Sequence, residues 1–172
     1  MNLKLADLTA AWEPTERWST TDASELYDVM SWGKGYFTVG ENGNLSVHPS
    51  KEAHRKIDLK KLIDELVLRG INPPILIRFG EILQHRMAEI HQAFVNAIAE
   101  HNYQNKYVCV FPIKVNQQRQ VVEEVYTYGK PFGFGLEAGS KPELLAVLGV
   151  AEGDTPIVCN GFKDDEYIEM VM

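Results

Sequence analysis

The sequence contains little cysteine, no long apolar run and no cluster of basic residues. Its two cysteines, Cys109 and Cys159, each lie inside an apolar stretch and form no CxxC pair. This usage favours two buried thiols in a reducing compartment over a disulfide framework. No stretch approaches the roughly 20 apolar residues of a membrane-spanning helix. The N-terminus also lacks an apolar signal-peptide core, so we expect a cytoplasmic protein that does not contact a membrane.

The composition is that of a soluble globular protein, with 45% hydrophobic and 24% charged residues. A chain of 172 residues is long enough to build one sizeable core. The formal net charge is −7, and the basic residues are scattered. An acidic protein without a basic patch is not expected to bind nucleic acid.

Residues 1–74 are expected to form an N-terminal segment. Within it, two β-prone runs between Gly35 and Pro49 flank Asn42-Gly43, a pair that favours a hairpin turn. The following apolar residues, from Ile57 onward, recur at helical spacing. Asp58 is suited to cap this helix at its start, and Gly70 lies just beyond its end.

Residues 75–172 have the pattern of alternating strands and helices. Ile75–Phe79 is predicted to be a strand, and a long helix with one apolar face follows it. Three strand-like runs then alternate with three helix-like segments: strands at 107–113, 132–137 and 155–161, helices at 118–129, 140–150 and 163–172. The strands are apolar on both faces, which predicts a parallel sheet covered by helices.

Polar residues follow the predicted strands at the edge where parallel β/α proteins carry their function. These residues are Lys114, Glu137, Ser140 and Asn160. Lys114 has two interpretations. Its stem can pack while its ammonium reaches solvent, or its amine can be a nucleophile that forms a Schiff base. Ser140 and Asn160 are equally suited to capping and turn roles.

The histidines form no evident ligand set. His85 and Glu89 lie one helical turn apart, but no third ligand accompanies them. We expect this pair to lie on a solvated helix face, and the sequence assigns no metal-binding residue.

Several motifs resemble one family. FPIKVNQQRQVVEEV (111–125), GLEAGSKPELLAVL (135–148) and IVCNGFKDDEYI (157–168) are similar, in order and spacing, to segments of biosynthetic arginine decarboxylases. These are pyridoxal-phosphate-dependent enzymes of the class-II ornithine, lysine and arginine decarboxylase family. ILIRFGEILQHRMAEIHQAF (75–94) and the hairpin region resemble the same family, so the similarity covers most of the chain after about residue 30.

The resemblance implies that residues 75–172 begin an alanine-racemase-like (fold type III) pyridoxal-phosphate-binding TIM barrel. It implies a lyase that converts L-arginine to agmatine and carbon dioxide, the first step of putrescine and spermidine biosynthesis. Lys114 would be the lysine that carries pyridoxal phosphate, and Glu137, Ser140 and Asn160 would contact the cofactor. The resemblance also implies Mg²⁺, with no ligands identified, and a homo-oligomer for the full-length protein.

The sequence stops at Met172 inside a helical pattern, so we expect an N-terminal fragment. In the family, the glycine-rich phosphate cradle, the acidic partner of the pyridine nitrogen and the C-terminal β-domain all lie further along. We therefore hypothesise that the chain alone is inactive and poorly folded. Two alternatives stay open: another pyridoxal-phosphate barrel enzyme, such as a different amino-acid decarboxylase or a racemase, and a non-catalytic fragment.

Overall fold

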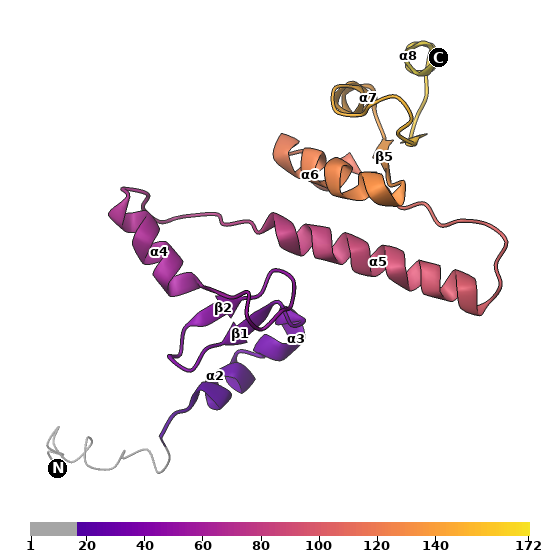
Figure 1. Cartoon of the computed structure of the whole chain (residues 1–172). Coiled ribbons are helices and arrows are strands. Elements are labelled where there is room, and N and C mark those ends of the chain that lie inside the picture. The colour runs from indigo at the N-terminus through magenta and orange to yellow at the C-terminus, as the bar shows by residue number, and fades with distance from the viewer. Residues whose placement is uncertain (1–16) are drawn as a thin grey trace, which may run out of the picture. The chain divides into compact units, whose positions relative to one another are not determined.

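The computed structural model describes residues 17–172, which form two compact units divided between Leu76 and Ile77 (Figure 1). The first 16 residues of the predicted N-terminal segment lie outside the described residues. No helix within residues 17–172 combines the length and the apolar character needed to cross a membrane. The first unit contains helices α2 (Thr20–Leu26), α3 (Val29–Gly33) and α4 (Leu59–Leu68) and strands β1 (Phe37–Val39), β2 (Leu45–Val47) and β3 (Ile57–Asp58).

The predicted hairpin is confirmed. Strands β1 and β2 pair antiparallel, with Phe37 opposite Val47, and the turn contains Gly43 at φ +78°. The connection is longer than a two-residue turn, because the Gly40 N–H donates to the Asn44 carbonyl at 2.8 Å. Strand β3 was not predicted. Ile57, assigned from the sequence to the helix, instead pairs with Val47.

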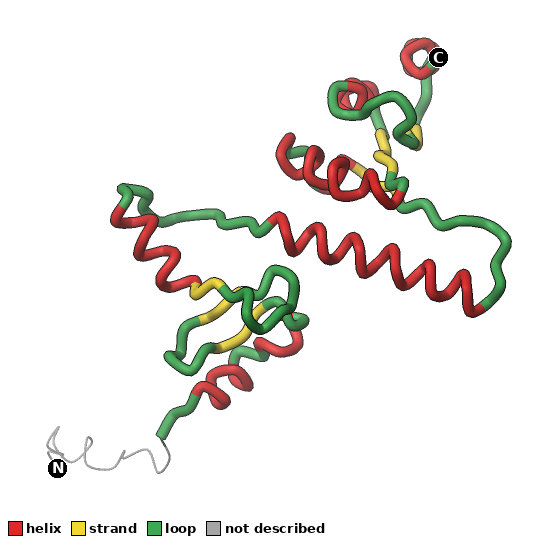
Figure 2. The backbone as a smooth tube through the Cα atoms, in the orientation of Figure 1, coloured by secondary structure: helices red, strands yellow, loops and turns green. Residues whose placement is uncertain are grey.

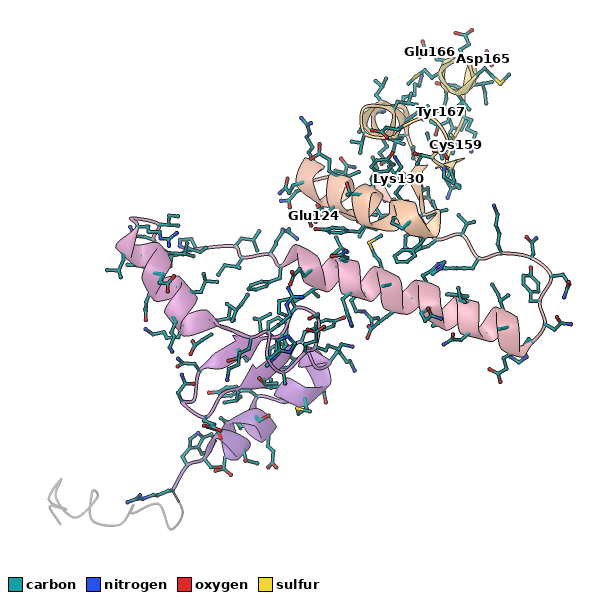
Figure 3. The ribbon with its side chains drawn as sticks, viewed as in Figure 1. Glu124, Lys130, Cys159, Asp165, Glu166 and Tyr167 are labelled. Carbon is teal, nitrogen blue, oxygen red and sulfur yellow. The ribbon has the colours of Figure 1, made fainter. Side chains whose placement is uncertain are left out.

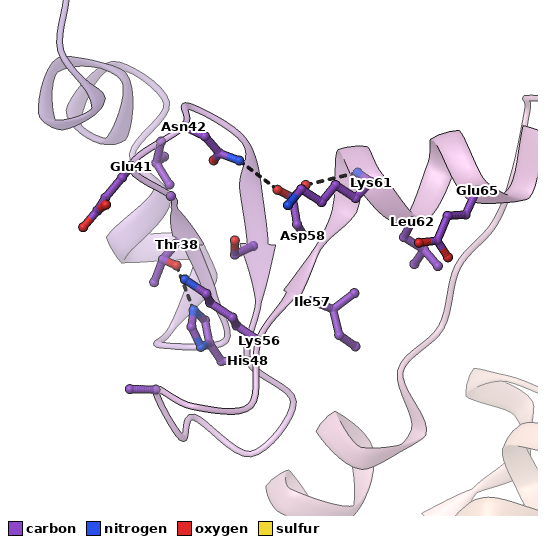
Figure 4. Close-up of a pocket in the computed structure, with 14 residues that line it drawn as sticks. Thr38, Glu41, Asn42, His48, Lys56, Ile57, Asp58, Lys61, Leu62 and Glu65 are labelled. Carbon is purple, nitrogen blue, oxygen red and sulfur yellow. Dashed lines mark hydrogen bonds between the residues drawn. The ribbon is translucent and has the colours of Figure 1, made fainter.

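Asp58 joins the hairpin turn to helix α4. It caps α4 as predicted, accepting from the Lys61 N–H at 3.1 Å. The Asn42 side chain also donates to its carboxylate at 3.0 Å (Figure 4). The Asn44 side chain donates to both carboxylate oxygens, at 2.9 and 3.1 Å. The amide donors, that of Asn44 first and that of Asn42 second, lower the pKa of Asp58 to about 2. The polar residues of this turn therefore stabilise their own unit.

The second unit contains the predicted alternation of strands and helices (Figure 2). Its elements are α5 (Gly80–Glu100), β4 (Val110–Pro112), the 3₁₀ turn η1 (Ile113–Val115), α6 (Arg119–Gly129), the 3₁₀ turn η2 (Lys130–Phe132), β5 (Gly135–Ala138), α7 (Lys141–Leu148), β6 (Ile157–Cys159) and α8 (Asp165–Val171). The strands form a parallel sheet in the order β4-β5-β6. Phe111, Leu136 and Ile157 lie side by side across it.

The prediction of a strand at Ile75–Phe79 was wrong. This segment is extended, but it forms no ladder pair with any residue from 17 to 172. A short apolar run has the composition of a strand, whereas a strand also needs a partner for its backbone N–H and C=O groups. Composition alone did not reveal that this partner is absent from the described chain.

One hydrophobic core holds the second unit together. Leu136 and Ala138 of β5, Val147 of α7 and Tyr167 of α8 are at most 1% exposed. The helix-like segment 118–129 forms α6, and its residues Val121, Val122 and Val125 are buried in this core. Cys109 and Cys159 are free and half-buried against this core. Helices and strands distant in sequence therefore meet in one cluster. This cluster includes Ala138 at the carboxyl end of β5.

Candidate active site

The carboxyl edge of the parallel sheet brings together three of the four predicted site residues. Lys114 lies in η1 just after β4, Glu137 lies in β5, and Asn160 follows β6. In the register, Glu137 lies between Pro112 of β4 and Val158 of β6. Because all three strands run in the same direction, the residues after them reach the same edge.

Glu137 connects the other two residues. Its Oε1 lies 3.9 Å from Lys114 Nζ and accepts a hydrogen bond from Asn160 Nδ2 at 3.4 Å. The Lys114 side chain is 61% exposed, whereas that of Glu137 is 17% exposed. The arrangement is a half-buried carboxylate, held by a neutral amide, that faces a solvent-accessible amine.

The local sequence explains why Lys114 lies outside the strand. Pro112 ends β4 and cannot donate a further ladder hydrogen bond. Ile113, which is fully buried, fixes the first residue of the 3₁₀ turn, and the Asn116 N–H closes that turn onto the Ile113 carbonyl at 3.1 Å. The Asn116 side chain then accepts from the Gln118 N–H at 3.0 Å, just before α6. The lysine is thus presented from a tight turn rather than from the ladder.

Ser140 has a different place from the other three residues. Its hydroxyl accepts from the Glu143 N–H at 3.4 Å and caps α7, as the sequence also predicted. Glu143 in turn accepts from the Gly139 N–H at 2.6 Å. These bonds fix the loop between β5 and α7. Contact between Ser140 and a cofactor stays a prediction.

Two further residues shape this edge: Tyr167, which was missed from the sequence, and Gly161, which follows Asn160 at the predicted end of the third strand. Tyr167 is 1% exposed and donates its hydroxyl to the Ala138 carbonyl at 3.1 Å. Gly161 has φ +75°, and a side-chain carbon there would lie 2.6 Å from the Gly139 carbonyl oxygen. The glycine in the Asn160-Gly161 pair was a usable turn signal. Tyr167 gave no signal beyond a place in a helical pattern.

The residues present fit part of the cofactor that the resemblance implies. A Schiff base needs an accessible primary amine, which Lys114 provides, and the Glu137 carboxylate lies beside that amine. In the part of the chain that the structure describes, no group of three His, Cys, Asp or Glu residues could hold a metal ion. His85 Nδ1 and Glu89 Oε1 lie 3.7 Å apart on α5, and within residues 17–172 they belong to no group of three metal-ligating residues.

Comparisons with known proteins identify the family. Residues 85–172 match the family described as pyridoxal-dependent decarboxylase, pyridoxal binding domain. The chain is 52% identical over 158 residues to the biosynthetic arginine decarboxylase of Geotalea uraniireducens, covering 91% of this chain and 25% of that protein. It is 49% identical over 156 residues to the enzyme of the same name from Rhodopirellula baltica, covering 91% and 23%.

A solved structure is similar as well. The chain resembles the crystal structure of the biosynthetic arginine decarboxylase SpeA from Campylobacter jejuni with a TM-score of 0.76 and 33% identity. The similarity covers 84% of this chain and 24% of that one. The chain therefore spans about a quarter of the length of the curated relatives it matches.

Proposed function

Because the chain belongs to the pyridoxal-dependent decarboxylase family and carries the start of its alanine-racemase-like barrel, as predicted, we propose that it supplies the cofactor lysine of an arginine decarboxylase. The reaction is decarboxylation of L-arginine to agmatine and carbon dioxide, a step toward polyamines. The identity of about half of all aligned residues with biosynthetic arginine decarboxylases supports this substrate.

The proposal gives each residue of the carboxyl edge a role. Lys114 Nζ would hold the cofactor through its aldehyde carbon. Glu137 orients that nitrogen from 3.9 Å and exchanges protons with it, while Asn160 orients Glu137. When bound, pyridoxal phosphate supplies the electron sink for the pair left as the α-carboxylate departs. Ser140 fixes the loop beside Glu137 and is proposed to contact the cofactor.

One observation supports the proposal most strongly: an exposed lysine amine facing a half-buried carboxylate at the carboxyl edge of a parallel sheet. A lysine that served only packing would not need that partner. A surface ion pair of this length contributes little to stability, about 0–1 kcal/mol. Its placement therefore has a better explanation in chemistry than in folding.

The experiment adds pyridoxal phosphate to the purified chain, reduces the mixture with borohydride, and locates the label by peptide mass analysis. We expect the label on the peptide containing Lys114, ahead of the other lysines. The same reduction after prior blocking of the cofactor's aldehyde is the control. Label spread evenly over all lysines, or no label, would contradict the proposal for this chain.

Substrate choice requires a separate test. Agmatine release from arginine, with no putrescine from ornithine and no cadaverine from lysine, is the outcome expected of an enzyme that contains this segment. A product from ornithine or lysine would instead support the alternative of a different pyridoxal-phosphate decarboxylase.

A second candidate is a non-catalytic segment. In that case the chain takes no selective label at Lys114 and releases no product.

The remaining parts of the proposal are a domain boundary between residues 74 and 75, a homo-oligomer for the complete enzyme, a cytoplasmic location and a Mg²⁺ requirement. The metal has no candidate ligand group among the described residues.

A further inference from the structure

The carbonyl of Ala138, next to Glu137, accepts two hydrogen bonds. One comes from the Asn160 N–H at 2.9 Å and continues the pairing of β5 with β6. The other comes from the Tyr167 hydroxyl at 3.1 Å. Ala138 and Tyr167 are both at most 1% exposed, so the bond between them does not compete with water. The last residue of β5 is therefore held from β6 and from α8 at the same time.

Tyr167 keeps its proton for this bond. Burial first, and the neighbouring Cys159 thiol second, raise its pKa to about 12. Figure 3 shows Tyr167 reaching from α8 toward the strand ends, close to Cys159. A buried tyrosine hydroxyl needs an acceptor, and here that acceptor is the backbone one residue from the site carboxylate.

The start of α8 is itself fixed. Asp164 accepts from the Tyr167 N–H at 2.9 Å and forms an ion pair with Lys141 at 2.7 Å. Lys141 is the first residue of α7 and also pairs with Glu166. The tyrosine thus enters the core from a helix end that is tied to the helix following β5.

We infer that Tyr167 is a positioning residue for the carboxyl edge: through the Ala138 carbonyl it holds Glu137 where it faces Lys114 and Asn160. Tyr167 contacts the backbone of β5 and not the reacting amine. The inference rests on the proposed role of Lys114 for its chemical meaning, whereas the restraint itself is a property of the chain alone.

The test compares Tyr167→Phe with Tyr126→Phe. The first variant removes the buried hydroxyl and keeps the ring, and Ala138 retains the bond from Asn160. The second is the matched control, because Tyr126 donates to Glu152 at 3.4 Å on the exposed side of α6. Two quantities are measured in each variant: hydrogen exchange of the Asn160 amide, and the share of borohydride-fixed pyridoxal phosphate found on Lys114.

In Tyr167→Phe we expect Asn160 exchange to become about fivefold faster, the loss equivalent to one hydrogen bond. We also expect the Lys114 share of label to fall severalfold at unchanged total label. The control should change neither. A folded Tyr167→Phe chain with the exchange rate and label share of the wild type would overturn the inference.

A second variant tests the inference if the Tyr167→Phe chain does not fold. Asp164→Asn keeps a capping side chain and removes the ion pair with Lys141, so Asn160 exchange should rise by a smaller factor. No rise in a folded Asp164→Asn chain also overturns the inference. The two proposals remain separable: absence of label on wild-type Lys114 contradicts the proposed function, whereas faster Asn160 exchange in the variants still supports the restraint.

Discussion

In the first unit, polar residues near the strand ends bond to one another. Asn42 and Asn44 of the hairpin turn donate to Asp58, which also caps α4. In an antiparallel sheet, successive strand ends lie at opposite edges, so a polar residue after a strand meets its own turn. The result is a local network that stabilises the segment.

In the second unit, the residues after the strands meet across long stretches of sequence. Three successive β/α units contribute Lys114, Glu137 and Asn160. Glu137 Oε1 lies close to the side chains of both other residues. All carboxyl ends of a parallel sheet lie at one edge, so side chains gather there without having to fold back on their own segment. The contrast teaches that strand direction decides whether polar residues after the strands can meet residues from other β/α units or bond only near their own turn.

The largest expected effect is on labelling by pyridoxal phosphate, which should distinguish a lysine of the second unit from a lysine of the first. Lys114→Met should abolish selective labelling by pyridoxal phosphate, because the amine that faces Glu137 is gone. Its side chain is 61% exposed, so the free energy of unfolding should change by only about 0.5 kcal/mol. Lys56→Met, in the first unit, is the control and should leave labelling of Lys114 intact. Retention of the label in the Lys114 variant would remove the distinction between the units.

A core substitution tests whether the edge depends on the core of its own unit. Leu136→Ala, at a residue 1% exposed, should lower the free energy of unfolding of the second unit by about 3 kcal/mol. Hydrogen exchange should rise throughout β4, β5 and β6. Val158→Ala, at a residue 43% exposed, should cost much less and is the control. Equal costs for the two variants would contradict this account of the core.

Two glycines with nearly the same φ angle, one in each unit, allow a direct comparison of the units. Gly43 has φ +78° and nothing within 4 Å of an added Cβ, whereas at Gly161, with φ +75°, that Cβ would lie 2.6 Å from a carbonyl oxygen. Gly43→Ala should cost about 1 kcal/mol, the penalty of the left-handed conformation alone. Gly161→Ala should cost more and should also reduce labelling of Lys114. Thermal unfolding and peptide mass analysis provide the measurements.

The smallest effect concerns pH and belongs to the first unit. Asp58 has a folded pKa of about 2, below its ordinary value of 3.8. Its stabilising contribution is therefore complete above about pH 4 and is lost as pH falls toward 2. Asp58→Asn should flatten the decline of the first unit's stability in this range. Asp22, whose pKa the Ser19 hydroxyl and N–H also lower, leaves a residual slope in the variant. An unchanged slope would contradict the role of the carboxylate.

Much of the second unit could be predicted from the sequence, because its signals are local and repeated. The Ser140 cap with Glu143 in the first turn marked α7, and polar residues after apolar runs marked the carboxyl edge. Direction of the sheet then predicted that Lys114, Glu137 and Asn160 would meet. The roles of these residues in cofactor binding stay predictions.

The features that were not predicted depend on contacts between distant segments, which a pattern within one segment does not identify. The run Ile75–Phe79 resembles a strand, yet pairing is a property of two segments and not of one. Ile57 fits a helix by spacing, but the hairpin beside it provides a ladder partner. Tyr167 was missed for the same reason. Its hydroxyl bonds to Ala138, 29 residues earlier in the chain.

The 3₁₀ turn that carries Lys114 has a consequence for movement. The role proposed for Lys114 requires its side chain to move while its backbone stays in place. The backbone of Lys114 lies beyond the β4–β5 ladder, in a turn closed by the Asn116 N–H and fixed below by Ile113. The Lys114 side chain can therefore change conformation without breaking any hydrogen bond of the sheet. The 3₁₀ turn η1 keeps its backbone in place during that movement.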